Sequence, residues 1–301
     1  MRVAILGFGL IGGSIARALS FARDAPAWSI AAWSPSGTGP ARAAAEGVVA
    51  DAVGDPAAAL DGAELVLIAA PPTATLDLLD RLGGPLHATL ADGTVITDVA
   101  STKASILATA TRHGLRFVGG HPMAGRETSG YDAAAGDLFI GRPWVVVPAD
   151  LADRPAALAV ETLAVACGAR PVTLDAEEHD SIVAAISHLP LVLSAALVEA
   201  VAGGAGPARD DWPRARSLAA SGWHGMTRLA RGDVAMGAGI AATNAPALAA
   251  RIRDLRLVLD GWLEELERPG GPDERRLADR LHAARGHLEP TAGHPDAEPR
   301  T

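Results

Sequence analysis

Cysteine is nearly absent from this sequence: Cys167 is the one cysteine among 301 residues. A single thiol excludes an internal disulfide and fits a chain that works in the reducing cytoplasm, where we expect the protein to be located. The Ala-rich surroundings of Cys167 predict a small buried side chain. Lysine is equally rare, since Lys103 is the only one. No residue pattern indicates a metal site, and we predict none.

Excess positive charge and long apolar runs are also missing. The formal net charge is −9, so a few placed cations, and no general basic surface, would have to bind an anionic substrate. The apolar N-terminus carries no signal-peptide cleavage pattern. The longest apolar run, residues 189–201, is interrupted by Pro190 and Glu199 and falls short of the ~18 residues of a membrane span. We therefore expect a soluble protein that binds neither nucleic acid nor membrane.

The first half of the sequence alternates short apolar runs with Ala-rich helical segments. Strand candidates begin at residues 2, 28, 64, 94, 116, 144 and 170. Helical segments are expected at residues 11–22, 73–81, 103–113 and 155–167. Strands that are apolar on both faces and alternate with helices predict an α/β fold with a mainly parallel sheet, covered by helices on each side.

The strand pattern stops near residue 175, and helical patterns follow at residues 177–201, 215–231 and 245–266. Pro190 is expected to kink or break the first of them. In the last, apolar residues recur every three or four positions: Leu248, Ile252, Leu255, Leu259, Trp262 and Leu266. The pattern predicts an all-α domain over residues 176–288 after the α/β domain over residues 1–175, and a disordered tail over residues 289–301. Because the apolar stripe is generous for so small a domain, we expect it to take part in subunit contact.

The first strand candidate runs directly into Gly7-x-Gly9-x-x-Gly12 at the start of a helix. Glycines in this position serve a tight turn, the close approach of backbone to a pyrophosphate, and close packing of helix on strand. The helix N-terminus adds free N–H groups and a dipole that favours an anion. The pattern predicts a Rossmann domain that binds NAD or NADP. The expected cofactor contacts here are Gly7, Phe8, Gly9, Leu10, Ile11, Gly12 and Ala70, the last at the end of the third strand candidate.

The second strand candidate ends without the acidic residue that binds the ribose 2′-hydroxyl of NAD. Ser34 follows the strand, and the next acid along the chain is Glu46. Ser34, Ser36 and Arg42 are suited to receive a 2′-phosphate, which slightly favours NADP. The alternative is a hydroxyl-rich turn that tolerates both cofactors.

Three further groups of residues follow this domain pattern. They are Ser101 and Lys103 in "TDVASTKASI", His121 and Glu127 in "GGHPMAGRETSG", and Ser187, His188 and Arg228 in the helical stretches "AISHLPLVLSAALVEA" and "GWHGMTRLA". Together with "GFGLIGGS", the set strongly resembles the prephenate/arogenate dehydrogenases of tyrosine biosynthesis, the TyrA family. The resemblance extends from residue 2 to about residue 252.

The resemblance implies a Rossmann domain followed by a helical domain that forms a homodimer. It also implies NAD(P)-dependent oxidative decarboxylation of prephenate or arogenate, to 4-hydroxyphenylpyruvate or tyrosine. A hydride leaves the ring carbon that bears the 4-hydroxyl group, and a base withdraws the hydroxyl proton; imidazole suits that role. We assign it to His121, which Pro122 restricts to extended backbone. The resemblance makes Ser101 a hydrogen-bonding partner of the hydroxyl and of His121, and makes Arg228 the clamp of a substrate carboxylate. The other implied substrate-side residues are Ser187, His188, Glu127 and Lys103.

The chain departs from the family pattern at three places. Many relatives that use prephenate read "SHLPH", but the second His is Leu191 here, which favours arogenate or mixed specificity. A Phe-Arg-Asp run frequent before "TR" is replaced by residues 223–225, "WHG", and a frequent Trp farther on is Gly237. These changes bear on the substrate and leave the reaction class in place.

Two other functions remain as alternatives. A β-hydroxyacid dehydrogenase or imine reductase also joins a Rossmann domain to a helical dimer domain, but its catalysis usually relies on a lysine in the helical domain. Lys103, the one lysine, lies outside that domain. A non-catalytic dinucleotide-binding regulator is the second alternative, and it predicts cofactor binding without turnover.

Overall fold

The computed structural model describes residues 1–22, 27–126, 128–151, 153–204 and 209–288. The chain divides into two compact units, Met1–Ala249 and Ala250–Thr301, which are described separately. The predicted tail at residues 289–301 lies outside the described residues. The predicted domain boundary at residue 175 differs from this division and stays a prediction.

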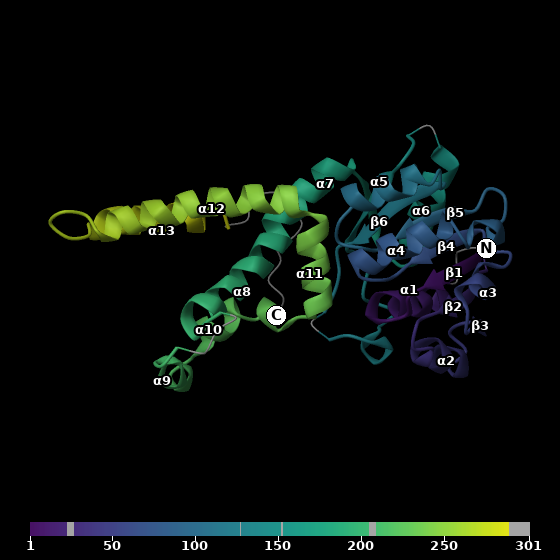
Figure 1. The fold of residues 1–301 in the computed structure, drawn as a ribbon, viewed down its shortest axis with the longest axis horizontal. Helices are drawn as coiled ribbons and strands as arrows, with labels where there is room; N and C mark the ends of the chain where they lie inside the picture. Colours follow the sequence, from purple (N-terminus) through teal and green to yellow (C-terminus); the bar gives the residue numbers. More distant parts are fainter. Residues whose placement is uncertain (23–26, 127, 152, 205–208, 289–301) are drawn as a thin grey trace. The chain divides into compact units, whose positions relative to one another are not determined.

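The described residues of the first unit form an eight-stranded sheet in the order β3-β2-β1-β4-β5-β6-β7-β8 (Figure 1). All neighbouring strands are parallel except β6 and β7, which are antiparallel. The predicted α/β fold with a mainly parallel sheet is therefore confirmed. The strand order reverses between β1 and β4, the kind of point where open α/β sheets bind ligands. The strands are β1 (Arg2–Leu6), β2 (Ser29–Trp33), β3 (Asp51–Ala52), β4 (Leu65–Ile68), β5 (Val95–Asp98), β6 (Phe117–Pro122), β7 (Pro143–Pro148) and β8 (Arg170–Thr173).

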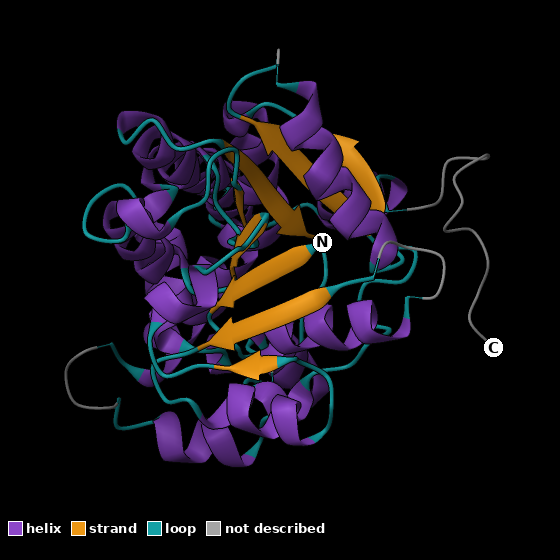
Figure 2. Ribbon diagram, turned by 90° about the vertical axis from the view of Figure 1, so that its right-hand side faces the viewer, coloured by secondary structure: helices purple, strands orange, loops and turns teal. Residues whose placement is uncertain are grey.

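Helices lie on both sides of the sheet, as Figure 2 shows. Up to β8 they are α1 (Leu10–Phe21), α2 (Thr38–Ala45), α3 (Pro56–Leu60), α4 (Pro72–Leu82), α5 (Ala104–Arg112) and α6 (Arg154–Ala166), with short 3₁₀ turns η1 (His87–Thr89) and η2 (Tyr131–Ala133). After β8 follow α7 (Ala176–Val183), the π-helical η3 (Ala184–His188), α8 (Leu189–Ala202), α9 (Trp212–Ser217), α10 (Ser221–Met226), η4 (Leu229–Arg231), α11 (Val234–Thr243), α12 (Ala245–Leu266) and α13 (Glu274–Gly286).

Most of the predicted elements form. The helix predicted over residues 215–231 is wrong, because α9, α10 and η4 divide that stretch. The interruptions lie between these elements: Ala220, between α9 and α10, has an extended backbone, and Thr227 follows the end of α10. The two-residue strand β3 and the helices α2, α3, α11 and α13 were not predicted.

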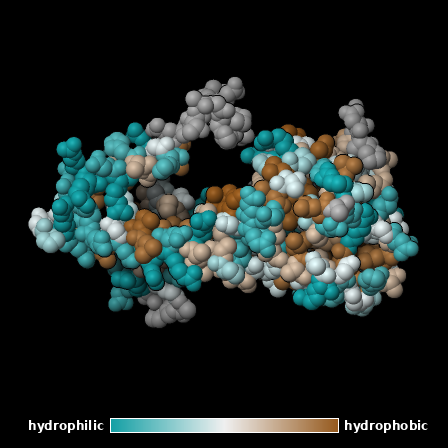
Figure 3. All heavy atoms as spheres, turned by 90° about the horizontal axis from the view of Figure 1, so that it is seen from above, coloured by the Kyte–Doolittle hydropathy of each residue, from teal (hydrophilic) through white to brown (hydrophobic). Residues whose placement is uncertain are grey.

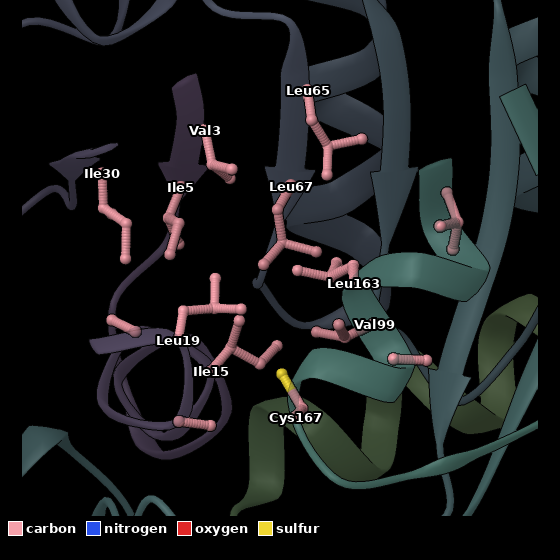
Figure 4. Close-up of a cluster of buried hydrophobic side chains, with 14 of the residues drawn as sticks. Val3, Ile5, Ile15, Leu19, Ile30, Leu65, Leu67, Val99, Leu163 and Cys167 are labelled. Carbon is pink, nitrogen blue, oxygen red and sulfur yellow. The ribbon is translucent and has the colours of Figure 1, made fainter. Parts of the chain in front are cut away.

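The core of the first unit packs α1 and α6 against one face of the sheet (Figure 4). Val3, Ile5 and Leu67 from the strands meet Ile15 from α1 in this cluster. Cys167 follows α6 and is buried there, as predicted. Burial raises the pKa of its thiol, so this side chain contributes packing and no thiolate chemistry.

The helical segments α7, η3 and α8 join into one helix of 27 residues, Ala176–Ala202. Pro190 was predicted to kink or break this helix; the helix continues through it, but a π-helical turn at Ala184–His188 interrupts the α-helix just before the proline, and such a turn re-routes the backbone hydrogen bonds that proline disrupts. The helix contains an 18-residue window with a mean hydropathy of 2.0, of which 22% is buried. By length and composition it qualifies as a membrane span, contrary to our expectation, although core helices of soluble proteins meet the same criteria.

The second unit contains most of α12 together with α13. Glu265 on α12 binds Arg276 on α13 at 2.8 Å, and Arg280 lies over the Trp262 ring at 4.3 Å. Much of the predicted apolar stripe of α12 is exposed; Figure 3 shows hydrophobic residues on the molecular surface. The exposed apolar residues of α12 are Ile252, Leu257, Val258, Leu259, Leu263 and Leu266.

Candidate active site

A cavity of ≈580 Å³ lies at the carboxyl ends of β1, β4, β5 and β6. Residues at or just beyond the ends of these strands, among them Gly9, Ala70, Ser101 and His121, line the cavity. Leu191 from α8 and the helix α11 also line it. The fold thus brings the glycine motif and the predicted base into one space.

The three glycines of the motif have different surroundings. Gly7 has a φ of +96°, and a Cβ atom there would lie 2.4 Å from the carbonyl oxygen of Ala69. A Cβ atom on Gly12 would lie 2.6 Å from the carbonyl oxygen of Gly7, whereas one on Gly9 would meet no described atom within 4 Å. Gly7 and Gly12 therefore allow the turn and the packing of α1, and Gly9 leaves open space. The N-terminus of α1, with no acid in its first turn, faces a space that fits a pyrophosphate.

The predicted ribose-side residues follow β2 and are not among the residues that line the cavity. The Ser34 hydroxyl is buried and has no hydrogen-bond partner among the described residues, and such an unsatisfied group fits a cofactor hydroxyl or phosphate. Ser36 accepts a hydrogen bond from the Thr38 backbone at 3.4 Å. Arg42 forms an ion pair with Asp132, so it would have to exchange that partner to bind a phosphate.

Ile11 and Leu10 line the cavity beside Gly9, whereas Phe8 does not. The Phe8 ring is buried and lies 5.4 Å from the ring of Tyr131 in η2. The predicted cofactor residues therefore divide into those on the cavity wall and those that shape the loop behind it.

A buried ion pair supports the loop that carries Ser101. The Asp98 carboxylate at the end of β5 accepts hydrogen bonds from the Ala100 backbone at 2.9 Å and from Lys103 Nζ at 2.5 Å. Burial lowers the pKa of Lys103, although the negative charge of Asp98 acts to raise it. We predicted Lys103 on the substrate side, but its ammonium group is fully buried against Asp98 and is not among the lining residues. It holds the loop beneath Ser101.

The glycine pair before His121 allows β6 to approach this ion pair. A Cβ atom on Gly119 would lie 2.8 Å from Lys103 Cδ, and one on Gly120 would lie 2.5 Å from the Asp98 carbonyl oxygen. The Gly120 N–H also donates to the Asp98 carboxylate at 3.1 Å. Larger residues would push the strand away, so the glycines determine where His121 enters the cavity.

His121 is 8% exposed and lines the cavity at the end of β6. Its Nδ1 atom lies 2.8 Å from Nε2 of His179, whose Nδ1 atom lies 2.8 Å from Oδ1 of Asp180. Burial lowers the pKa of His121 well below its usual value, and the charges of His179, Lys103 and His188 lower it further. The imidazole is therefore neutral at neutral pH, as a proton acceptor must be.

Our sequence prediction did not include His179 and Asp180 in the site. The only local signal is the run "EEHD" at the start of α7, which fits an ordinary polar helix start equally well. Their contact with His121 spans 58 positions of the sequence and follows from the packing of α7.

The two predicted residues of η3 do not line the cavity. Ser187 is exposed. His188 is buried, and its Nδ1 atom lies 3.0 Å from the Asn244 amide nitrogen. Burial lowers the pKa of His188 to about 4. In this geometry His188 packs behind the site.

Two arginines are candidates to bind the substrate carboxylate. Arg228 is exposed, and it directly precedes Leu229, a lining residue. Arg126 was not predicted, although it belongs to the polar turn after His121; it is the one arginine or lysine among the lining residues that the structure describes. Glu127, also predicted, lies outside the described residues.

Two positions that depart from the family pattern meet in the cavity. Leu191 and Gly237 both line it, and Leu191 Cδ2 lies 3.6 Å from the place of a Cβ atom on Gly237. This part of the wall is therefore apolar and small, without a histidine or a tryptophan side chain.

Comparison with known proteins agrees with this site. The nucleotide-binding domain of prephenate dehydrogenase matches residues 17–173, and the prephenate dehydrogenase dimerization domain matches residues 175–276. The prephenate dehydrogenase of Bacillus subtilis is 30% identical over 269 residues, which cover 88% of this chain and 68% of the relative.

Solved structures show the same architecture. Synechocystis arogenate dehydrogenase superposes with a TM-score of 0.76 at 29% identity, over 96% of this chain and 100% of that one. The prephenate dehydrogenase of A. aeolicus, in complex with hydroxyphenyl propionate and NAD⁺, superposes with a TM-score of 0.82 at 22% identity, over 96% of this chain and 98% of that one. The predicted resemblance is confirmed, and the chain belongs to the prephenate dehydrogenase family.

Proposed function

We propose that this chain catalyses the NAD(P)-dependent oxidative decarboxylation of prephenate or arogenate, as an enzyme of tyrosine biosynthesis in the cytoplasm. The observation that carries the proposal is the neutral, buried His121 in the same cavity as the open space at Gly9. A base and a nucleotide site in one enclosed space are what removal of a hydride and a proton from one C–OH group requires.

The residues have distinct tasks in this reaction. The nicotinamide, when bound, supplies the acceptor for the hydride on the ring carbon that bears the hydroxyl group. His121 accepts the hydroxyl proton, and Ser101 hydrogen-bonds the same oxygen. The ring carboxylate then leaves as CO2, and its bonding electrons complete the aromatic ring. The proton returns to the oxygen, which becomes the phenol of the product.

For the cofactor, we propose that Gly9, Leu10 and Ile11 hold the pyrophosphate and that Ser34 contacts the ribose. Since Ser34 stands where NAD-specific domains carry an acid, we propose that NADP⁺ is accepted at least as well as NAD⁺. Arg42 supports this preference only if it leaves Asp132.

For the substrate, we propose that arogenate is used alone or together with prephenate. The support is the apolar wall at Leu191 and Gly237, which offers no imidazole to a second carboxylate or keto group. A homodimer through the helical domain is proposed from the exposed apolar residues of α12 and the match to a dimerization domain.

Replacing Arg126 with alanine is expected to raise KM for prephenate by about 10- to 100-fold with little change in kcat, because a charge-assisted hydrogen bond to a carboxylate contributes roughly 1.5–3 kcal/mol. Arg228→Ala, measured beside it by steady-state kinetics, should have the smaller effect. A raised KM in Arg228→Ala with an unchanged KM in Arg126→Ala would show that Arg228, and not Arg126, binds the carboxylate.

The function is tested by absorbance at 340 nm with prephenate and arogenate, each with NAD⁺ and with NADP⁺. We expect turnover, with arogenate and NADP⁺ as good as or better than the other pairs. A clear preference for prephenate with NAD⁺ would refute the interpretation of Leu191 and Ser34. Cofactor binding without turnover in any of the four assays would favour the non-catalytic regulator.

A further inference from the structure

A chain of three buried side chains begins at the cavity and ends at the N-terminus of α5. It runs from His121 on β6 to His179 and Asp180 on α7, with two contacts of 2.8 Å. His179 is 1% exposed and Asp180 is 4% exposed. The two imidazole rings lie at an angle of 74° to each other, with their centroids 5.1 Å apart.

Asp180 is held as an ionised acceptor. Its Oδ1 atom accepts hydrogen bonds from the Lys103 backbone N–H at 2.8 Å and from His179, and its Oδ2 atom accepts one from the Ala104 N–H at 2.9 Å. Burial opposes ionisation, but the hydrogen bonds from His179, Ala104 and Lys103 outweigh it and lower the pKa of the carboxyl group. Every contact named here therefore has Asp180 as the acceptor.

This arrangement determines the tautomers of both histidines. Because Asp180 only accepts, His179 carries its proton on Nδ1 and presents a lone pair at Nε2. His121 must then donate its Nδ1–H to that lone pair, which leaves the His121 Nε2 atom unprotonated. The His121 Nε2 atom takes no part in the contacts with His179 and Asp180, and His121 lines the cavity.

We propose that His179 and Asp180 are positioning residues that set the tautomer of His121 and share the proton it accepts. The proposal rests on the proposed function, in which His121 is the base. When Nε2 takes the hydroxyl proton, the Nδ1 proton of His121 moves toward Nε2 of His179, and the positive charge comes to lie beside Asp180. The proton returns to the substrate oxygen when CO2 leaves and the phenol forms.

The other charged groups around His121 make such a relay useful. Lys103, from the loop before α5, and His188, from η3, both disfavour a positive charge on His121. Asp98 is already paired with Lys103. Asp180 is therefore the carboxylate placed to stabilise the protonated pair, and it acts through His179.

The first test is Asp180→Asn, measured as kcat and kcat/KM against pH. An amide cannot accept at both oxygen positions, so His179 or the α5 backbone loses its partner, and the negative charge is gone. We expect kcat to fall by as much as about 10⁴-fold, the loss that a wrong histidine tautomer causes in a catalytic triad. The acid limb of kcat/KM should move to lower pH, since the protonated pair loses its counter-charge. NAD⁺ affinity should stay within about threefold.

The second test compares His179→Gln with His179→Leu. Glutamine can accept from His121 and donate to Asp180, so it preserves the tautomer of His121 without taking a proton; leucine does neither. We expect the leucine variant to lose about 100-fold or more in kcat and the glutamine variant to lose less. Thr243→Val is the matched control, because it removes a comparable contact of 2.9 Å between α11 and Thr102 without touching the relay. Its pH profile should be unchanged.

Two results would overturn the relay. One is wild-type kcat in both Asp180→Asn and His179→Leu; the other is a lower kcat with an unmoved acid limb, which indicates a structural role alone. The ¹⁵N spectrum of histidine-labelled protein without substrate tests the tautomer independently of turnover. We expect His121 protonated at Nδ1 in the wild type and in His179→Gln; protonation at Nε2 in the wild type refutes the proposal. Absence of wild-type turnover would instead refute the proposed function.

Discussion

Replacing His121 with asparagine is expected to lower kcat by about 10²- to 10⁴-fold, the usual contribution of a general base. Asparagine keeps a polar side chain at the end of β6 but cannot hold the hydroxyl proton. NAD⁺ binding, measured by titration, should stay within about threefold of wild type, because the glycine turn and Ser34 are untouched. His87→Asn makes the same chemical change at an exposed site outside the cavity lining and should leave kcat unchanged.

The pH profile sharpens this prediction. Since burial lowers the pKa of His121, the wild-type kcat/KM should be maintained as the pH falls through ~6.5, the ordinary histidine value, and decline only below it. The asparagine variant should lack that acid limb. Near-wild-type turnover in His121→Asn, measured by absorbance at 340 nm, would exclude His121 as the base.

Gly9→Ala and Gly12→Ala are expected to affect different properties: Gly12→Ala lowers stability, and Gly9→Ala weakens cofactor binding. At Gly12 the new Cβ would meet the Gly7 carbonyl oxygen at 2.6 Å, a backbone atom with little room to move, so we expect a loss of about 1–3 kcal/mol in the free energy of unfolding. At Gly9 the Cβ meets no described atom within 4 Å and φ is −101°, so stability should stay within ~0.5 kcal/mol.

Gly9→Ala should instead weaken NAD⁺ and NADP⁺ binding by about 10-fold or more, because its methyl group enters the space through which the pyrophosphate approaches the backbone. Urea unfolding and cofactor titration of both variants separate the two effects. Unchanged cofactor affinity in Gly9→Ala would move the pyrophosphate site away from this turn. Unchanged stability in Gly12→Ala would show that α1 shifts easily on β1.

The exposed apolar residues of α12 and the 27-residue apolar helix Ala176–Ala202 raise one common question, namely what covers them. In the homodimer that we propose from the match to a dimerization domain, a second copy of the chain covers them. No apolar run of the sequence was expected to reach the length of a membrane span, yet the helix Ala176–Ala202 continues through Pro190 and meets that criterion by length and composition.

The sequence by itself determined the sheet and the glycine turn, and it pointed to the residue that we propose as the base. Apolar runs and helical periods are local patterns, and the right-handed connection between parallel strands leaves few arrangements for them. The roles of Gly7 and Gly12 follow from backbone geometry at the end of a strand, and His121 was identified by its own motif. For the same reason the alternating elements of the first half were predicted at nearly their observed positions.

Only the tertiary structure decided which polar side chains meet. Lys103 stands in the same motif as Ser101, yet it is buried against Asp98 and supports the loop from below. His179 joins His121 across 58 positions, and Arg126, not Arg228, lines the cavity. Burial and hydrogen-bond partners depend on contacts between elements distant in the sequence, and no local spacing records them.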